Sequence, residues 1–277
     1  MQYIIFDLEW NNGNRPIKGS FFDEIIEIGA VRLDERLNPV DTFSRLIKPT
    51  ANLRLSSLVK RLTHINKDEL SNAKHFKPVY ADFLKWCGLA ETTVVTWSTM
   101  DIQVLLKNLV FHKMGDALEF MHHFADVQQF VREKLGLDAG RSPGLSAAAE
   151  ILGIKCDDMD MHRALDDAIV TAKCLKSAYN EDFLSFIKPA DSDFYKRLAF
   201  KAKVIFDYDN RLIKKSLMVP SCPCCGLMLK RSSAFTPRSK AFDASFFCGG
   251  CDTHFNGRVR VKQEYDGIVY IKKLNEL

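Results

Sequence analysis

The 277-residue sequence lacks any apolar run close to the ~18 residues that a membrane-spanning helix needs. It also lacks an N-terminal basic region followed by an apolar signal core, and it has no internal repeat or low-complexity segment. A hydrophobic content of 47% is typical of a soluble globular protein. We therefore expect a cytoplasmic protein with no membrane partner, long enough for one domain with a substantial core and a smaller second domain.

The eight cysteines do not form the pattern of a disulfide-stapled secreted protein. Three are single and scattered, and five lie close together near the C-terminus. Within this group two C-x₂-C pairs, Cys222/Cys225 and Cys248/Cys251, are separated by 22 residues. Four thiolates in two such pairs suit one tetrahedral Zn²⁺, and the segment resembles a zinc ribbon. The alternative is a redox dithiol. Cys224 is a spare or alternate ligand, and His254 is a weaker competitor.

The net charge is only +4, but it is unevenly distributed. Residues 201–277 carry 14 basic and 7 acidic side chains, whereas the first 200 residues have a net charge of −3. A basic module beside an acidic body is typical of a nucleic-acid-binding protein, although a merely solvated basic face is the alternative. In the ribbon, basic residues alternate with phenylalanines, so we expect it to bind substrate through Lys230, Arg231 and Arg258, or else to dock a protein partner.

The first ten residues hold the clearest chemical signal. Residues 3–6 form a short apolar run typical of a buried strand, and Asp7 and Glu9 follow at its end. In an extended chain residues i and i+2 project from the same face, so the two carboxylates point to one place. A hard divalent cation between them would offset their repulsion. A simple polar turn is the alternative interpretation.

The chain then predicts an α/β arrangement. We expect strands at 24–33 and 40–47, helices at 55–62, 68–70 and 79–86, and a strand at 92–97. Further helices are expected to begin at Asp101, to span 127–135 and 145–152, and to run from near His162 to Tyr179. Loops are predicted at 13–19, 140–143 and 157–160. Asp101 begins one helix and is either its cap or a ligand at the sheet edge. His162 and Asp167 begin the last helix, where a capping histidine and a surface acid are the plain alternatives.

Taken together, these motifs resemble the DEDDh (DnaQ-like) family of 3′–5′ exonucleases over about residues 2–180. The resemblance lies in F-D-L-E-W with Asp7 and Glu9, E-I-I-E-I-G-A-V, W-x-x-x-D with Asp101, and H-x-A-x-x-D-A with His162 and Asp167. The first two motifs look most like the exoribonuclease branch. The segment L-T-H-I is similar to the family's L-T-G-I, and it has His64 where glycine is usual.

The resemblance implies an RNase H-like fold, a mixed sheet flanked by helices, followed by a small β zinc ribbon. It implies that Asp7, Glu9, Asp101 and Asp167 hold two Mg²⁺ or Mn²⁺ ions and that His162 is the general base. The partner would be single-stranded RNA or DNA with a free 3′ end, with RNA favoured, and the product a nucleoside 5′-monophosphate. Asp166 is the rival ligand.

The expected domains are an exonuclease domain at 1–180, a linker with helical and strand segments at 181–215, and the ribbon at 216–277. Leu8, Trp10, His64 and Trp97 are candidate substrate contacts, with the core as the alternative for Leu8 and the two tryptophans. In the linker and ribbon we expect strands at 204–208, 213–219, 258–265 and 268–274. The competing function is a scaffold or polymerase-accessory protein that binds nucleic acid or a partner through the ribbon.

Overall fold

The computed structural model describes residues 2–12, 22–88, 90–137, 142–156, 159 and 161–277. The three predicted loops at 13–19, 140–143 and 157–160 lie wholly or partly outside these residues. The chain forms two compact units, residues 1–198 and 199–277, so the predicted linker at 181–215 is divided between them. In the described ranges, no helix combines the length and the hydropathy that a membrane span requires.

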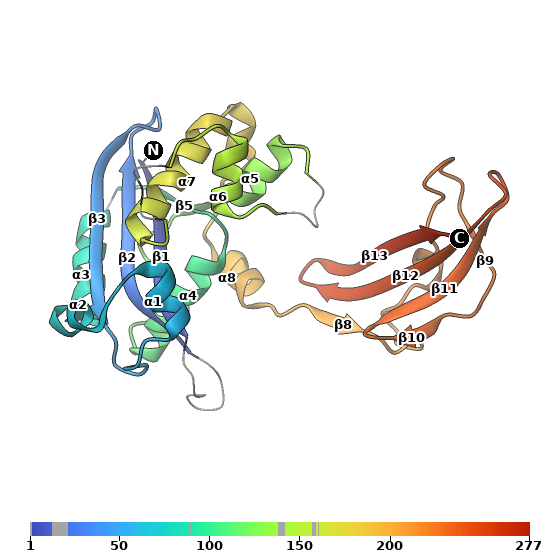
Figure 1. Ribbon diagram of the computed structural model, residues 1–277, viewed down its shortest axis with the longest axis horizontal. Helices are drawn as coiled ribbons and strands as arrows, with labels where there is room; N and C mark the ends of the chain where they lie inside the picture. The colour runs from blue at the N-terminus through green and yellow to red at the C-terminus, as the bar shows by residue number, and fades with distance from the viewer. Residues whose placement is uncertain (1, 13–21, 89, 138–141, 157–158, 160) are drawn as a thin grey trace. The chain divides into compact units, whose positions relative to one another are not determined.

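The first unit is built on a seven-stranded mixed sheet in the order β4-β3-β2-β1-β5-β6-β7 (Figure 1). Its strands are β1 (Gln2–Asn12), β2 (Asp23–Leu33), β3 (Pro39–Lys48), β4 (Lys74–His75), β5 (Thr92–Thr96), β6 (His123–Asp126) and β7 (Lys188–Pro189). Strands β1, β2 and β3 form an antiparallel meander, and β5 and β6 continue the sheet in parallel with β1. The short strands β4, β6 and β7 were not predicted, because two to four residues give no periodic signal.

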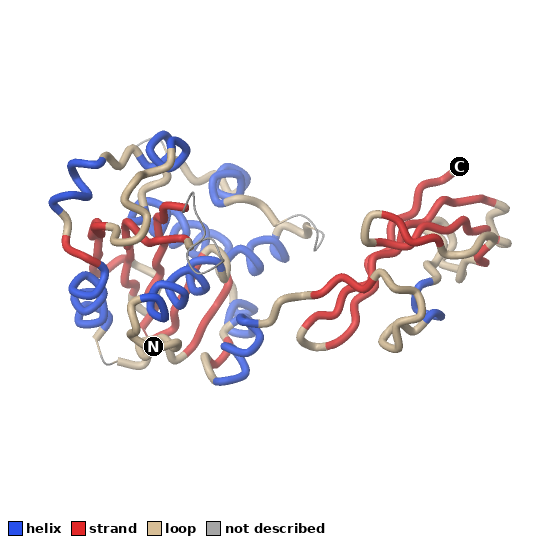
Figure 2. The backbone as a smooth tube through the Cα atoms, turned by 90° about the horizontal axis from the view of Figure 1, so that it is seen from below, coloured by secondary structure: helices blue, strands red, loops and turns tan. Residues whose placement is uncertain are grey.

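Helices cover both faces of this sheet, as the tube view shows for the first unit (Figure 2). They are α1 (Ser57–Thr63), α2 (Lys67–Asn72), α3 (Phe76–Cys87), α4 (Met100–Phe111), α5 (Val127–Lys134), α6 (Leu145–Ile151), α7 (Ala164–Ala178), the 3₁₀ helix η1 (Glu181–Phe186) and α8 (Ser192–Ala199). Side chains of a strand alternate between faces. Ile4, Phe6 and Leu8 accordingly pack toward α3 and α4, and Tyr3 and Ile5 pack toward α5, α6 and α7.

Strand β1 is longer than the sequence predicts. It continues through Asp7 and Glu9 to Asn12, so the carboxylates lie within the strand and not at its end. The extra residues pair with the start of β2 after a bulge between Glu9 and Trp10, and this pairing satisfies their backbone groups. The buried Asn11 side chain also holds the loop after β3, because it donates to the carbonyl oxygens of Asn52 and Arg54.

The second unit is a small antiparallel β structure. Its elements are β8 (Lys203–Ile205), the 3₁₀ helix η2 (Lys215–Met218), β9 (Lys230–Arg231), β10 (Thr236–Arg238), β11 (Ala241–Cys248), β12 (Thr253–Glu264) and β13 (Gly267–Glu276). The sheet order is β10-β11-β12-β13, with β8 paired to β12 and β9 paired to β11. Strands β12 and β13, predicted at 258–265 and 268–274, form a hairpin with its turn at Tyr265 and Asp266.

The strand predicted at residues 213–219 is wrong, because this segment contains η2 instead. Ile213 and Met218 are both buried in the same cluster with Phe242 and Val259. Residues five apart would point to opposite faces of a strand, whereas a helical turn lets both side chains reach one core. The apolar spacing therefore reports a turn that folds back onto the sheet.

Candidate active site

Three acidic side chains from two elements converge on one face of the first sheet. Asp7 and Glu9 follow Tyr3 and Ile5 on the β1 face that α7 covers, and Asp167 lies in the first turn of α7. One carboxylate oxygen from each of the three lies within 4.8 Å of the other two. The i, i+2 spacing in the strand and the position of Asp167 in the helix thus bring these three predicted residues together.

The cluster is electrostatically unfavourable without a cation. Burial raises the pKa of Glu9 to about 8, and the charges of Asp167 and Glu27 add to this effect. Burial likewise raises the pKa of Asp167 to about 6, and burial together with Asp101 raises the pKa of Asp7 well above its usual range. The Oδ1 atom of Asp167 is buried and has no hydrogen-bond partner among the described residues. Crowded, unsatisfied carboxylate oxygens are the ligands that Mg²⁺ and Mn²⁺ prefer, so the residues fit such an ion.

Asp101 lies beside this cluster but outside the set of mutually close oxygens. It is buried in the first turn of α4, and its Oδ1 accepts a hydrogen bond from the backbone N–H of Leu8 at 3.2 Å. Burial raises the pKa of Asp101 to about 7, and among the neighbouring charges Asp101 contributes most to the raised pKa of Asp7. Asp101 is therefore near Asp7, and one of its oxygens is held by the β1 backbone.

His162 lies just before α7, at the edge of the carboxylate cluster. Its φ angle of 73° is in the left-handed region, and its side chain is exposed. A hydrogen bond from the His162 backbone amide and the charge of its imidazole both lower the pKa of Asp167 and so oppose the effect of burial. The predicted pair is therefore close in space, with the imidazole open to solvent.

The start of α7 packs directly against β2 at Gly29. A Cβ atom on Gly29 would lie 2.0 Å from the backbone nitrogen of Leu165 and 2.1 Å from the carbonyl carbon of Ala164. Only glycine leaves room for this approach, because the atoms it would meet belong to the backbone. Gly29 is also paired with Asp7 across the strands, so the close approach places α7 next to the acidic residues of β1.

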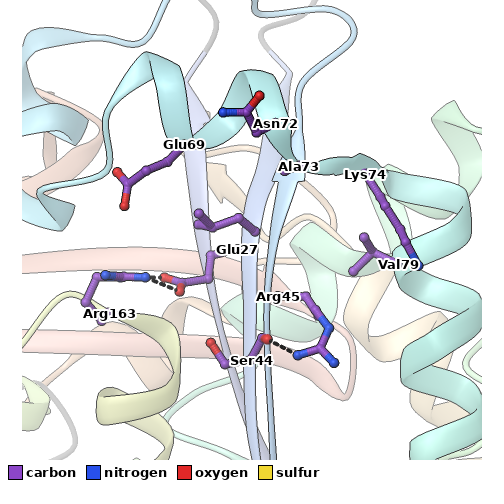
Figure 3. A pocket seen from close by; sticks show the side chains of 10 residues that line it. Glu27, Ser44, Arg45, Glu69, Asn72, Ala73, Lys74, Val79 and Arg163 are labelled. Atoms are coloured by element: carbon purple, nitrogen blue, oxygen red, sulfur yellow. Dashed lines mark hydrogen bonds and ion pairs between the residues drawn. The ribbon is translucent and has the colours of Figure 1, made fainter.

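An ion pair between Arg163 and Glu27, which the sequence analysis did not predict, also fixes the start of α7. Arg163 donates through Nη2 and Nε to the two oxygens of Glu27, at 2.7 and 3.1 Å, and the backbone N–H of Ala164 donates to the same carboxylate at 3.2 Å. Figure 3 shows the Arg163 and Glu27 side chains pointing toward each other. Glu27 is opposite Glu9 in the sheet and is buried. The sequence offered one signal of this ion pair, the charged Glu27 between the apolar residues Ile26 and Ile28.

A pocket of about 340 Å³ adjoins this ion pair. Glu27 and Arg163 line it together with residues of β3, α2, β4 and α3, including Arg45, Glu69 and Lys74 (Figure 3). None of the three clustered carboxylates lines this pocket. The Glu27–Arg163 ion pair therefore borders this pocket of mixed charge, while Glu27 also lies opposite Glu9 of the acidic cluster.

The candidate substrate contacts fall into two groups. Leu8 and Trp97 are buried in the two cores of the first unit, the position that the alternative interpretation gives them. Trp10 is only partly buried, and His64 is exposed at the C-cap of α1. His64 has a φ angle of 56°, a conformation that glycine adopts most easily, which accounts for the family's preference for glycine there.

The four predicted zinc ligands come together in the second unit. Sulfur atoms of Cys222, Cys225, Cys248 and Cys251 all lie within 4.8 Å of one another, and Cys224 is outside this set. The backbone amides of Cys225 and Cys224 donate toward the Cys222 sulfur and lower the pKa of its thiol to about 6. Four converging sulfurs suit one tetrahedral metal ion.

The basic candidates of the ribbon differ in their surroundings. Lys230 and Arg231 are exposed on β9, with the Arg231 guanidinium 4.9 Å from the Phe235 ring centroid. Arg258 is only partly exposed: it pairs with Asp243 at 3.3 Å and donates to the carbonyl oxygen of Arg238 at 2.8 Å. Arg258 therefore holds the sheet together, whereas Lys230 extends into solvent.

Known proteins resemble the first unit. A family model described as Exonuclease (RNase_T) matches residues 4–175. The probable 3′–5′ exonuclease KapD of Bacillus subtilis is 28% identical over 167 residues, which cover 57% of this chain and 74% of KapD. The PolC-type DNA polymerase III of Thermotoga petrophila is 32% identical over 172 residues, which cover 62% of this chain but only 11% of that polymerase.

Among solved structures, the nuclease domain of 3′hExo, described as a DEDDh family member bound to rAMP, has a TM-score of 0.56 and 22% identity. The match covers 63% of this chain and 90% of that domain. At this identity the likeness concerns the fold. The first unit thus has the RNase H-like exonuclease fold that the sequence predicts.

Proposed function

This chain belongs to the exonuclease family, and on that premise we propose that it shortens single-stranded nucleic acid from the 3′ end, RNA in preference to DNA. The observation that carries this proposal is the convergence of Asp7, Glu9 and Asp167, whose oxygens lie within 4.8 Å of one another beside His162 and Asp101. The preference for RNA is supported by F-D-L-E-W and E-I-I-E-I-G-A-V, the motifs that look most like the exoribonuclease branch.

The proposed cofactors are two Mg²⁺ or Mn²⁺ ions in the first unit. Asp7, Glu9 and Asp167 would hold them, and Asp101 would contribute the oxygen that does not accept from Leu8. When bound, such ions lower the pKa of water and stabilise negative charge on phosphate oxygens. In the second unit, the four clustered cysteines would hold one structural Zn²⁺.

His162 is the proposed general base. Its exposed imidazole beside Asp167 would take a proton from the attacking water while the water oxygen bonds to the terminal phosphorus. The bond from phosphorus to the 3′ oxygen then breaks and releases a nucleoside 5′-monophosphate. The released 3′ oxygen takes up a proton from solvent and becomes the new 3′ hydroxyl, so the shortened strand can enter the next cycle.

The test is a time course on 5′-labelled single-stranded RNA and DNA of one sequence, with Mg²⁺, with Mn²⁺ and with a chelator. We expect a metal-dependent ladder that shortens from the 3′ end, faster on RNA. His162→Ala should lower the rate at least about 100-fold, because general base catalysis contributes that much or more. His75→Ala, which changes an exposed histidine on β4, is the matched control.

Two outcomes would contradict the proposal. A faster ladder on DNA would reverse the sugar preference but leave the exonuclease in place. Binding of both strands without degradation of either, under all metal conditions, would favour the scaffold function instead.

A further inference from the structure

The sheet of the second unit is packed on one face and open on the other. Alternate residues of β11 and β12, such as Phe242, Phe246, Phe255 and Val259, are buried in the core clusters of this unit. The residues between them point the other way, as the pleat requires. We call this second surface the open face, and it runs across β9, β10, β11, β12 and β13 (Figure 1).

The strand register shows which charged side chains share the open face. Its basic residues are Lys230, Arg238, Arg258, Arg260, Lys262 and Lys273. Its acidic residues are Asp243, which pairs with Arg258, and Glu264 at the far end of β12. Among the described residues, no ion pair neutralises Arg260, Lys262 or Lys273. The open face therefore keeps an excess positive charge.

Aromatic side chains lie on the same face, at the end near the four cysteines. Phe247 on β11 and His254 on β12 are directly opposite each other, with ring centroids 4.9 Å apart. His254 is exposed and Phe247 is partly exposed. Lys230 is the neighbour of Phe247 on the other side. A cation, two rings and then a row of basic residues thus follow one another along the face.

We propose that the open face binds a single strand of nucleic acid, with phosphates against Arg260, Lys262 and Lys273 and a base stacked on His254 and Phe247. This proposal rests on the proposed function, because the strand is the upstream part of the same substrate. Base stacking on aromatic rings within a basic groove is the usual chemistry of such sites. A protein partner fits less well, because Ser245 and Asn256 occupy the middle of the face and its exposed apolar side chains, Val269 and Ile271, are opposite the basic residues Lys262 and Arg260.

The structure changes which ribbon residues should matter. Arg231 is opposite the buried Phe246 and contacts Phe235, so it lies toward the packed side. Arg258 is occupied by Asp243 and by the Arg238 carbonyl oxygen. The binding residues therefore shift from these two sequence candidates to Arg260, Lys262 and Lys273, while Lys230 keeps its place.

The binding test uses the full chain with Asp7→Asn, so that the strand stays intact, and a 5′-fluorescein 20-nucleotide oligouridylate. The double variant Arg260→Ser with Lys262→Ser removes two charges from the open face. Its matched control, Arg211→Ser with Lys214→Ser, removes two charges from the exposed loop before η2. At 100 mM salt we expect about tenfold weaker binding for the first and no change for the second, with a salt slope shallower by about 1.4.

A third variant separates stacking from charge. His254→Ala, measured at pH 8, should weaken binding about fivefold and leave the salt slope unchanged, because it removes a ring and no phosphate contact. Zinc content is measured for every variant to show that the ribbon is intact. Equal affinity of the open-face and control variants would overturn the proposal.

Activity separates this proposal from the proposed function. In the chain with an intact first unit, the open-face variant should raise KM for the 20-mer about tenfold. It should leave the cleavage of a trinucleotide unchanged, because a trinucleotide offers the open face almost no phosphate to bind once its 3′ end lies at the acidic cluster. If the chain cleaves neither, the exonuclease function fails while the binding test still decides on the open face. If the parent chain cleaves both substrates and the open-face variant has the same KM for the 20-mer as the parent, only the open-face proposal is wrong.

Discussion

Arg163 and Glu27, 136 residues apart in the sequence, form a two-pronged ion pair in which the Glu27 side chain is only 1% exposed. Glu27 belongs to β2 and is opposite Glu9, and Arg163 directly follows His162. The pair therefore connects the strand beside the acidic cluster with the residue next to the proposed base. Its fixed, bidentate geometry restricts where His162 can lie.

Arg163→Ala should reduce both activity and stability. It leaves a buried carboxylate without its cation, and because Arg163 is partly exposed we expect a loss of about 2 kcal/mol, less than the ~3–5 kcal/mol of a fully buried pair. We expect kcat to fall roughly 10- to 100-fold through displacement of His162. Denaturant unfolding and kcat on a 5′-labelled oligonucleotide measure the two effects.

Arg163→Lys separates charge from geometry. Lysine restores the positive charge but cannot make the two parallel hydrogen bonds of the guanidinium, so stability should largely recover while kcat stays low. Full recovery of kcat with lysine would show that the bidentate geometry does not position His162.

Gly29→Ala should prevent α7 from reaching its place. The added methyl group would lie 2.0 to 2.1 Å from backbone atoms of Leu165 and Ala164, far inside van der Waals contact, so the helix must move. We expect a loss of about 2 kcal/mol, within the ~1–3 kcal/mol range for overpacking, and a loss of metal-dependent activity. Gly144→Ala is the matched control, because its Cβ would meet nothing within 4 Å and its φ is −68°.

The pH dependence of stability should reveal the acidic cluster. Buried carboxyl groups with a raised pKa, about 8 for Glu9, 7 for Asp101 and 6 for Asp167, favour the protonated form in the folded state. The folded chain then binds more protons than the unfolded chain from about pH 4 upward, so their stabilisation is lost as pH rises toward 8. In chelator, Tm should fall by roughly 5 °C or more between pH 5 and pH 8.

Mg²⁺ should reverse this loss at pH 8 and have little effect at pH 5, where the ligands are protonated. Asp7→Asn provides the control, because it removes one charge at nearly constant size. Without metal at pH 8 this variant should be more stable than the parent chain, yet inactive and insensitive to Mg²⁺. A lower Tm for Asp7→Asn under these conditions would count against electrostatic strain in the cluster.

Local spacing predicted that Asp7 and Glu9 share one face, and the motif order shared with the DEDDh family predicted their convergence with Asp167. The first two lie two residues apart in a strand, and the third lies one turn into a helix after a histidine. The spacing of the two C-x₂-C pairs likewise predicted the four-sulfur cluster. Each cluster of ligands could be predicted because its residues are near each other in the chain or follow a motif order that a known family shares.

The remaining features depend on contacts across long sequence distances. Nothing local relates Glu27 to Arg163, or Gly29 to Ala164, because both contacts exist only once α7 lies on β2. The end of β1 was misplaced because Asn11 and Asn12 look like loop residues, although pairing with β2 keeps them extended. The open face of the ribbon also needed the strand register, since a slip of one residue would exchange its basic and buried side chains.

Cys248→Ser should release the structural metal, and Cys224→Ser should not. Cys248 is buried, with its sulfur 3.5 Å from that of Cys225, whereas Cys224 is exposed and outside the four-sulfur set, although it is next to a ligand in the chain. We expect about one zinc ion per chain for the parent and for Cys224→Ser, and much less for Cys248→Ser. Because a small β unit depends on its metal, hydrogen exchange should speed up across 199–277 and stay unchanged across 2–198. Zinc retained by Cys248→Ser but lost by Cys224→Ser would assign the site to the spare cysteine.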